Sequence, residues 1–476
     1  MSRYLTLLCV LLAVPAWTQK VTVSEETSMR TDYAYDILGQ IDDRILLYRD
    51  RGNEKMVEVF DEDLKFLYDR ELILQERRAA VYGLVKQDSS FTIFTGFTRK
   101  GKYTLVANRY NKDVQPLDTS LVIDQQEDFK GSNFRFVTSR DRSKTLLFSG
   151  RDGKFLNMYV VDNNTLELLW WKEILLKGFD VRKDFRQIFV TENGEVNVLF
   201  HNEEVAKGLP QFLLIGASYD ENVYVNKLRV DKKHIIDIKC RYDSKNYGIV
   251  IAGLASDDSR NDADSYFYIS TPLSSLKAVN DITYRNFDAR FIEEVYGKKL
   301  GKRKQLNDFV TRDVIVRNDG GMVLVTEMKK EFYRRSSFNN MAPGTGGAGR
   351  GWVDIYTEDI VLVAVSPTGV EEWKKILYKK QFSQDDGGAF SSFFIFKTPN
   401  RIRLVYNDEV KENSTVSEYV LDPLGRYERN SLLSTEYQNL KIRWRDGVQI
   451  GPGVLLAPSE VNNKLSIVKV DYNVRS

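Results

Sequence analysis

The chain has 476 residues, of which 42% are hydrophobic and 12% aromatic, a composition typical of a protein with a large buried core. The 69 lysines and arginines nearly balance the 67 aspartates and glutamates, so the formal net charge is only +2. A nucleic-acid-binding surface needs concentrated basic residues, which this even mixture does not supply. The composition therefore excludes a disordered chain and gives no support to a nucleic-acid partner.

The N-terminal segment has the pattern of a secretory signal. Arg3 supplies the positive start, residues 5–14 form an apolar stretch, and either Val14-Pro15-Ala16 or Ala16-Trp17-Thr18 provides a plausible cleavage site. We predict a signal peptide over residues 1–18 and a single mature domain over 19–476. No later apolar run approaches about 18 residues, so no transmembrane segment is expected in the mature chain. We expect an exported protein, in the periplasm rather than at the cell surface.

Two cysteines are present, and Cys9 falls within the predicted signal. Cys240 is then alone, which rules out a disulfide within the mature chain. Its setting, IIDIKC, is typical of a buried strand, and a reactive thiol is the alternative.

Short segments rich in β-branched and aromatic residues follow one another along the mature chain, among them FTIFTGF, NMYVV, YGIVIAGL and DIVLVAV. Four stretches share a strand, a polar turn and a second strand: VEVFDEDLKFLYDREL, YVVDNNTLELLWWKEI, LVAVSPTGVEEWKKIL and YVLDPLGRYERNSLL. Such hairpins recur about every fifty residues, which is the signature of a β-propeller. We predict an all-β fold, a single propeller of about eight four-stranded blades, with seven as the alternative.

The turns of the repeating unit fall near Asp61, Arg109, Asp162, Tyr219, Thr271, Ser366, Asp422 and Asp471. The last unit ends just after Asp471, while KVTVSEETS at the start of the mature chain has no sheet of its own. We therefore predict that the N-terminal strand completes the final blade and closes the ring, which removes an exposed edge.

The long interval between Thr271 and Ser366 holds two predicted insertions. The first, residues 285–306, places apolar residues at helical spacing and predicts a short amphipathic helix followed by a basic segment. The second, residues 334–352, contains GTGGAG, which matches the dinucleotide fingerprint in letters only. Strand patterns flank it on both sides and no helix follows, so we predict the tip of a long hairpin and no cofactor.

Basic residues in these two insertions could meet an anionic or protein partner, with a solvated loop as the alternative. The candidate interaction residues are Arg334, Arg335, Arg350, Trp352, Lys298, Lys299, Lys302, Arg303 and Lys304.

The stretch LNDFVTRDVIVRNDGGMVLVTE, the glycine-rich tip and YTEDIVLVAVSPTGVEEWKKILYKKQ together resemble an arrangement found in uncharacterised secreted proteins of Bacteroidetes. The resemblance covers residues 306–381. It implies an exported, propeller-like protein and supplies no catalytic residues.

Residues for catalysis or metal binding are scarce. His201 and His234 are the only histidines, and neither lies in a motif for nucleophilic catalysis or zinc binding, so we predict strand-end or surface positions and no catalytic site. The loop ASDDSRNDADSYFY offers Asp257, Asp258, Asp262 and Asp264 as weak calcium candidates, without the EF-hand order. The tryptophans Trp170, Trp171, Trp373 and Trp444 either line a sugar platform or, as we expect, fill space between blades.

Two functions remain from the sequence. The first is a non-enzymatic interaction scaffold for an unknown envelope protein. The second is a glycan-binding or carbohydrate-active propeller with acidic and aromatic residues gathered at its central channel.

Overall fold

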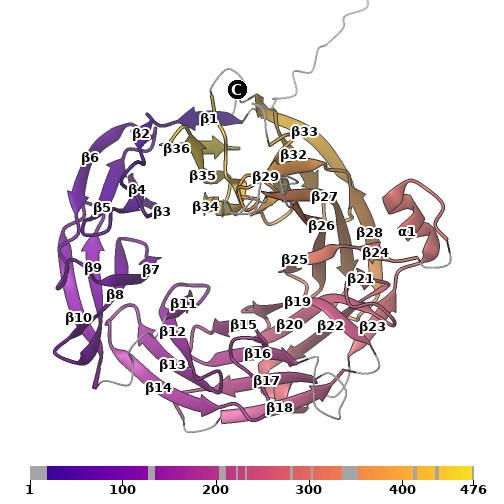
Figure 1. Cartoon of the computed structure of the whole chain (residues 1–476), viewed down its shortest axis with the longest axis horizontal. Helices are drawn as coiled ribbons and strands as arrows, with labels where there is room; N and C mark the ends of the chain where they lie inside the picture. The colour runs from indigo at the N-terminus through magenta and orange to yellow at the C-terminus, as the bar shows by residue number, and fades with distance from the viewer. Residues whose placement is uncertain are drawn as a thin grey trace, which may run out of the picture.

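The computed structural model of the chain describes residues 19–126, 134–202, 211–220, 223–230, 233–278, 282–301, 304–334, 352–410, 415–434 and 439–473. Eight sheets of antiparallel strands form the blades of a closed ring, seen along its axis in Figure 1. The predicted all-β propeller with eight blades is confirmed. The predicted signal over residues 1–18 lies outside the described residues.

Each blade runs from an innermost to an outermost strand in chain order, except where the ring closes. Blades one and two are β3 Ala34–Ile41, β4 Arg44–Asp50, β5 Lys55–Phe60 and β6 Phe66–Glu71, then β7 Ala80–Lys86, β8 Ser90–Arg99, β9 Lys102–Asn111 and β10 Pro116–Gln126. Blades three and four are β11 Arg135–Thr138, β12 Lys144–Arg151, β13 Phe155–Asp162 and β14 Leu168–Leu175, then β15 Phe185–Val190, β16 Val196–Asn202, β17 Gln211–Ala217 and β18 Val223–Arg229.

The second half of the ring contains most of the elements that do not belong to the regular four-stranded blades. Blades five and six are β19 His234–Asp243, β20 Gly248–Ser256, β22 Ser265–Pro272 and β23 Thr283–Asn286, then β25 Phe309–Val316, β26 Met322–Arg334, β27 Trp352–Val365 and β28 Glu371–Leu377, with β29 Gln381–Gln384 added beside β27. Blades seven and eight are β30 Phe393–Lys397, β31 Ile402–Asn407, β32 Thr415–Leu421 and β33 Tyr427–Ser434, then β34 Val448–Gly451, β35 Val454–Val461, β36 Lys464–Asp471 and β1 Lys20–Val23. The short pieces are β2 Thr27–Ser28, β21 Asp262–Ala263, β24 Leu306–Asn307 and the 3-10 helices η1 Leu273–Ala278 and η2 Trp444–Asp446.

The N-terminal strand closes the ring, as predicted. β1 pairs antiparallel with β36, with Thr22 opposite Lys469 and Val23 opposite Val468, and the two strands lie together at the top of Figure 1. Just past β1, the Ser24 backbone N–H donates to the Ile467 carbonyl at 2.9 Å. The first and last strands of the chain therefore share one sheet, and β36 has no free edge.

The predicted amphipathic helix is present as α1 Ala289–Tyr296, between blades five and six. Asp288 is the N-cap and accepts a hydrogen bond from the Phe291 backbone N–H, and Gly297 ends the helix in the left-handed conformation. Phe291, Ile292 and Val295 are buried against the blades. The helix is thereby fixed to the ring by its apolar face.

The core lies between neighbouring blades, and tryptophans fill part of it as expected. The indole N–H of Trp170 donates to the Gly194 carbonyl of the next blade at 3.0 Å, and that of Trp373 donates to the Pro423 carbonyl at 3.1 Å. Trp444 is 1% exposed and joins blade eight to Asn407 of blade seven. Trp171 is the exception, because it is 52% exposed on the outer strand β14.

The two faces of the ring differ. On one face, which we call the turn face, lie the connections from first to second strands and, in blades one to seven, from third to fourth strands; these connections are short in sequence except for the segment carrying η1. Most predicted turn positions lie there: Asp61, Asp162 and Asp422 each accept backbone N–H hydrogen bonds from their own turns. Arg109 lies inside β9, just before its end. The other face, the loop face, carries the connections between blades, α1 and the outer half of the β26–β27 hairpin.

His201 lies at the end of β16, as predicted, but it is buried rather than on the surface. Its side chain is 1% exposed, and Nε2 has no hydrogen-bond partner among the described residues. Burial and the nearby charge of Arg186 lower the pKa of His201 from 6.5 to about 3. The folded protein therefore holds this imidazole neutral.

The His201→Leu variant is expected to be less sensitive to acid than the wild type. Below pH 6.5 the unfolded chain binds a proton at His201 that the folded chain does not bind until about pH 3, so this group lowers stability by about 1.4 kcal/mol per pH unit as pH falls. Urea unfolding at pH 7.5 and at pH 5.0 gives the free energy of unfolding at each pH. Between these two pH values, the free energy of unfolding should fall by about 2 kcal/mol more in the wild type than in the variant. An equal decrease in the free energy of unfolding in the two proteins would contradict a buried neutral His201.

Candidate functional site

The loop face is most elaborate over blades six, seven, eight and one. There the outer half of β26, residues 329–334, pairs with β27, which in turn pairs with β29. These three strands form a ribbon that extends beyond blade six. The glycine-rich tip between β26 and β27, with Arg335 and Arg350, lies outside the described residues, while the pairing of Arg334 with Trp352 confirms the hairpin arms that flank it.

One side of this ribbon carries a row of aromatic rings across all three strands. The ring centroids of Phe332 and Tyr356 are 5.8 Å apart, and those of Tyr356 and Phe382 are 4.9 Å apart. Phe332 is 43% exposed, and Tyr333, on the opposite side of β26, is 78% exposed. We call Phe332, Tyr333, Tyr356 and Phe382 the aromatic ribbon. Exposed aromatic clusters of this kind are typical of binding surfaces.

A buried ionic cluster lies at the base of the aromatic ribbon. The side chains of Glu327 and Lys379 are both fully buried, with Nζ 2.8 Å from Oε1. Lys379 also donates to the Thr357 carbonyl at 3.0 Å and to Gln381 Oε1 at 2.9 Å. Glu327 accepts from Ser392 and pairs with Arg312. The cluster thus joins β25, β26, β27 and the segment leading to blade seven.

Electrostatics favour the charged form of Glu327. Burial by itself would raise the pKa of Glu327, but the positive charges of Lys379 and Arg312 outweigh it and hold the pKa below its ordinary value. Burial lowers the pKa of Lys379, and the Glu327 carboxylate opposes that shift. Because each charge depends on its partner, the base of the ribbon is held in one arrangement.

The segment after β29 connects the ribbon to blade eight. Asn407 of blade seven donates to the Phe390 carbonyl at 3.0 Å, and Lys441 Nζ lies 4.0 Å from the centroid of the Phe390 ring. Gly388 lies beside Ile355 of the ribbon and Arg445 of η2. The aromatic ribbon and η2 therefore belong to one continuous part of the loop face.

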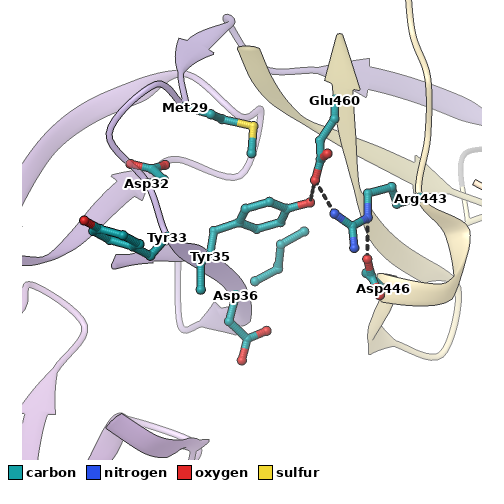
Figure 2. Close-up of a pocket in the computed structure, with 10 residues that line it drawn as sticks. Met29, Asp32, Tyr33, Tyr35, Asp36, Arg443, Asp446 and Glu460 are labelled. Atoms are coloured by element: carbon teal, nitrogen blue, oxygen red, sulfur yellow. Dashed lines mark hydrogen bonds and ion pairs between the residues drawn. The ribbon is translucent and has the colours of Figure 1, made fainter. Parts of the chain in front are cut away.

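Next to η2, a pocket of about 510 Å³ opens where blade eight meets blade one. Its lining comes from both ends of the chain: the segment before β3, the start of β3, η2 and the end of β35. Figure 2 shows Tyr33, Tyr35 and Asp36 on the side of blade one, with Arg443, Asp446 and Glu460 facing them. We call this the seam pocket.

Hydrogen bonds and ion pairs fix the wall of the seam pocket on blade eight. Tyr35 donates its hydroxyl to Glu460, and Arg443 pairs with the same carboxylate. Arg443 also lies 2.6 Å from Asp446 through Nε. Burial, the hydrogen bond to Glu460 and the Glu460 charge raise the pKa of Tyr35, so this phenol stays protonated at neutral pH.

A second buried ionic group supports the wall of the seam pocket on the side of blade one. Asp32 and Arg49 are each 1% exposed and 2.6 Å apart, and Arg49 also pairs with Glu58. Asp32 is therefore already neutralised. Asp36 differs, because it is exposed and has no ion-pair partner among the described residues.

The predicted interaction residues are only partly brought together. Arg334 pairs with the buried Asp354 at 2.6 Å, and Trp352 is half-buried beside it in the ribbon. In the other predicted group, Lys298 and Lys299 are exposed just after α1, and Lys304 pairs with Glu293 of that helix at 2.8 Å. Lys302 and Arg303 lie outside the described residues.

The weak calcium candidates take part in the local structure of their loop. Asp264 accepts from Ser256 Oγ at 2.9 Å, Asp258 accepts from Gln305, and Asp257 pairs with Lys233 at 2.8 Å. Asp262 accepts from Ser259 at 3.3 Å. Within the described ranges, no group of three His, Cys, Asp or Glu side chains is arranged to hold a metal ion.

Sequence reasoning did not find the seam pocket. Its residues come from three separate places, which are the segment around YAYD at residues 33–36, RWRD at residues 443–446 and Glu460 in β35, so the first lies more than four hundred positions from the other two. The usable signal was the predicted ring closure, which brings the first and last blades together and therefore brings these two stretches of aromatic and charged residues to one seam.

Comparison with known proteins adds a likeness of shape. No protein-family model matches the sequence, and no curated protein matches it. Among solved structures, the Dos1 propeller is 9% identical with a TM-score of 0.46, covering 94% of each chain. The polysaccharide lyase Uly1 is 9% identical with a TM-score of 0.41, covering 82% of this chain and 90% of that one.

In the described part of the chain, no helix is long and apolar enough to cross a membrane.

Proposed function

We propose that this protein is an exported, non-catalytic propeller that binds a partner protein through its loop face. The observation that carries the proposal is the aromatic ribbon, in which Phe332 and Tyr333 are exposed; it extends from blade six and is held by a buried ionic cluster. Rings that are exposed yet fixed in place lose little conformational entropy when they are buried against a partner. Export to the cell envelope is part of the proposal and comes from the N-terminal signal pattern.

The turn face makes a suitable comparison. Its exposed apolar side chains include Tyr219 of blade four and Leu424 of blade seven, which are 72% and 68% exposed, and exposed side chains on separate blades are ordinary for a protein surface. On the loop face, Phe332 and Tyr333 are exposed on neighbouring positions of β26, Phe332 continues into a row with the half-buried Tyr356 and Phe382, and the seam pocket lies nearby. This difference between the faces favours recognition through the loop face.

Replacing Phe332 and Tyr333 with serine is expected to weaken partner binding by about tenfold or more, because truncating aromatic anchors typically costs 2 kcal/mol or more. The measurement is capture from an extract of the native cells, followed by titration of the identified partner against both proteins. The matched control is Tyr219→Ser on the turn face, which should bind as the wild type does. A partner lost from the control but kept by the ribbon variant would contradict the proposal.

A glycan-binding function is the second candidate. The seam pocket favours it, because carboxylates and tyrosines gather there beside the innermost strands β3 and β34. Saturable binding of a neutral oligosaccharide that is lost in Tyr35→Phe and Asp36→Asn variants would support this candidate.

A further inference from the structure

We propose that the seam pocket binds a cationic side chain, an arginine or lysine presented by the partner protein. This inference rests on the proposed function, since it names the chemistry by which the loop face would recognise its partner.

The charge balance of the pocket favours a cation. Asp36, Asp446 and Glu460 line it, and Arg443 is the one basic residue in the lining. Asp32 also belongs to the wall but is neutralised by Arg49 at 2.6 Å and by Arg51 at 3.3 Å. The lining therefore carries an excess of negative charge. Partial enclosure strengthens the attraction of that charge for a cation relative to open water.

The protein already holds one guanidinium in this pocket. Arg443 lies between Glu460 and Asp446, with its guanidinium carbon 5.8 Å from the centroid of the Tyr35 ring. Two carboxylates and a tyrosine face are the groups that bind a guanidinium or ammonium well. Arg443 shows that this combination functions within the same cavity.

The facing wall repeats these residue types without a cation. Tyr33 is 83% exposed, and Asp36 offers a carboxylate that no described cation neutralises. Figure 2 shows both on the side of the pocket opposite Arg443. A basic side chain entering here would meet the Asp36 carboxylate.

The Tyr33 ring is held in place by the turn beneath it. Gly52 has φ +79°, and a Cβ at this position would lie 2.8 Å from Tyr33 Cε2. Asp50 organises the same turn by accepting hydrogen bonds from the Gly52 backbone N–H at 2.8 Å and Lys55 Nζ at 2.6 Å. The ring of Tyr33 therefore lies next to this turn.

The test uses the full mature chain and three capped tripeptides, Gly-Arg-Gly, Gly-Lys-Gly and Gly-citrulline-Gly, in low-salt titration calorimetry or NMR. Citrulline has the shape of arginine without its charge. The arginine peptide is expected to bind about tenfold more tightly than the citrulline peptide, and Asp36→Asn should remove that preference. The matched control is Asp43→Asn on the turn face, which should retain it.

Equal affinity for the arginine and citrulline peptides, or an unchanged preference in Asp36→Asn, would overturn the inference. Binding of a neutral oligosaccharide in place of the cationic peptides would also overturn it, in favour of a glycan. If the peptides do not bind while the Phe332 and Tyr333 variant still loses the partner, the cation site is wrong and the proposed function stands.

Discussion

Replacing Glu327 with glutamine is expected to lower the free energy of unfolding by about 3–5 kcal/mol. The glutamine is similar in size, so the change removes a charge and leaves the packing nearly intact. Lys379, whose side chain is fully buried, and the neighbouring Arg312 would then be two positive charges without a carboxylate between them. Urea unfolding followed by tryptophan fluorescence measures the loss.

A second variant separates the charge effect from general disruption of the site. The double change Glu327→Gln and Lys379→Met removes both members of the fully buried pair, and we expect it to recover part of the stability lost by Glu327→Gln alone. Glu331→Gln, in the exposed part of the same strand, should change stability by no more than about 0.5 kcal/mol. A Glu327→Gln protein as stable as the wild type would show that the cluster does not hold the ribbon.

Replacing Thr22 with proline is expected to open the ring where it closes, at a cost of about 3 kcal/mol or more. Thr22 lies opposite Lys469, two positions before Ser24, whose N–H bonds to β36. Because backbone groups alternate in direction along a strand, the Thr22 N–H also points toward β36. Proline lacks this N–H, and its ring would meet the neighbouring strand.

The matched control at this position is Thr22→Ala, which keeps the backbone N–H and should cost less than about 1 kcal/mol. Hydrogen exchange gives the local readout: in the proline variant, the amides of β36 should lose protection while those of blade four keep theirs. Uniform loss across all blades, or none at β36, would refute the view that β1 is the closing strand.

The architecture was predictable because it repeats. Hairpins between third and fourth strands carry a polar residue at the turn, as at Asp61 and Asp422, and the recurrence of this unit about every fifty residues was enough to predict eight blades. The isolated strand pattern at residues 20–23 predicted the closure, since a blade lacking its outer strand leaves an edge. The helix was predictable from the spacing of Phe291, Ile292 and Val295.

The buried ionic cluster and the seam pocket were less visible in the sequence, because they depend on contacts between distant segments. Nothing local to Glu327 or Lys379 shows that both are buried and paired, since charged residues in strands are usually exposed. His201 was expected at a strand end, but its burial depends on neighbours such as Phe212, whose ring centroid is 5.1 Å away. The candidate basic residues near α1 are separate from the seam pocket, which draws on both ends of the chain.

Hydroxyl-radical footprinting in an extract of the native cells, compared with the purified protein, tests the proposed binding face most directly. Tyr33 and Tyr333 on the loop face are 83% and 78% exposed, and Tyr219 on the turn face is 72% exposed, so the three tyrosines should be labelled alike when the protein is alone. With a partner bound, we predict protection of Tyr33 and Tyr333 and unchanged labelling of Tyr219. Protection of Tyr219 with continued labelling of Tyr33 and Tyr333 would place the partner on the turn face and contradict the account.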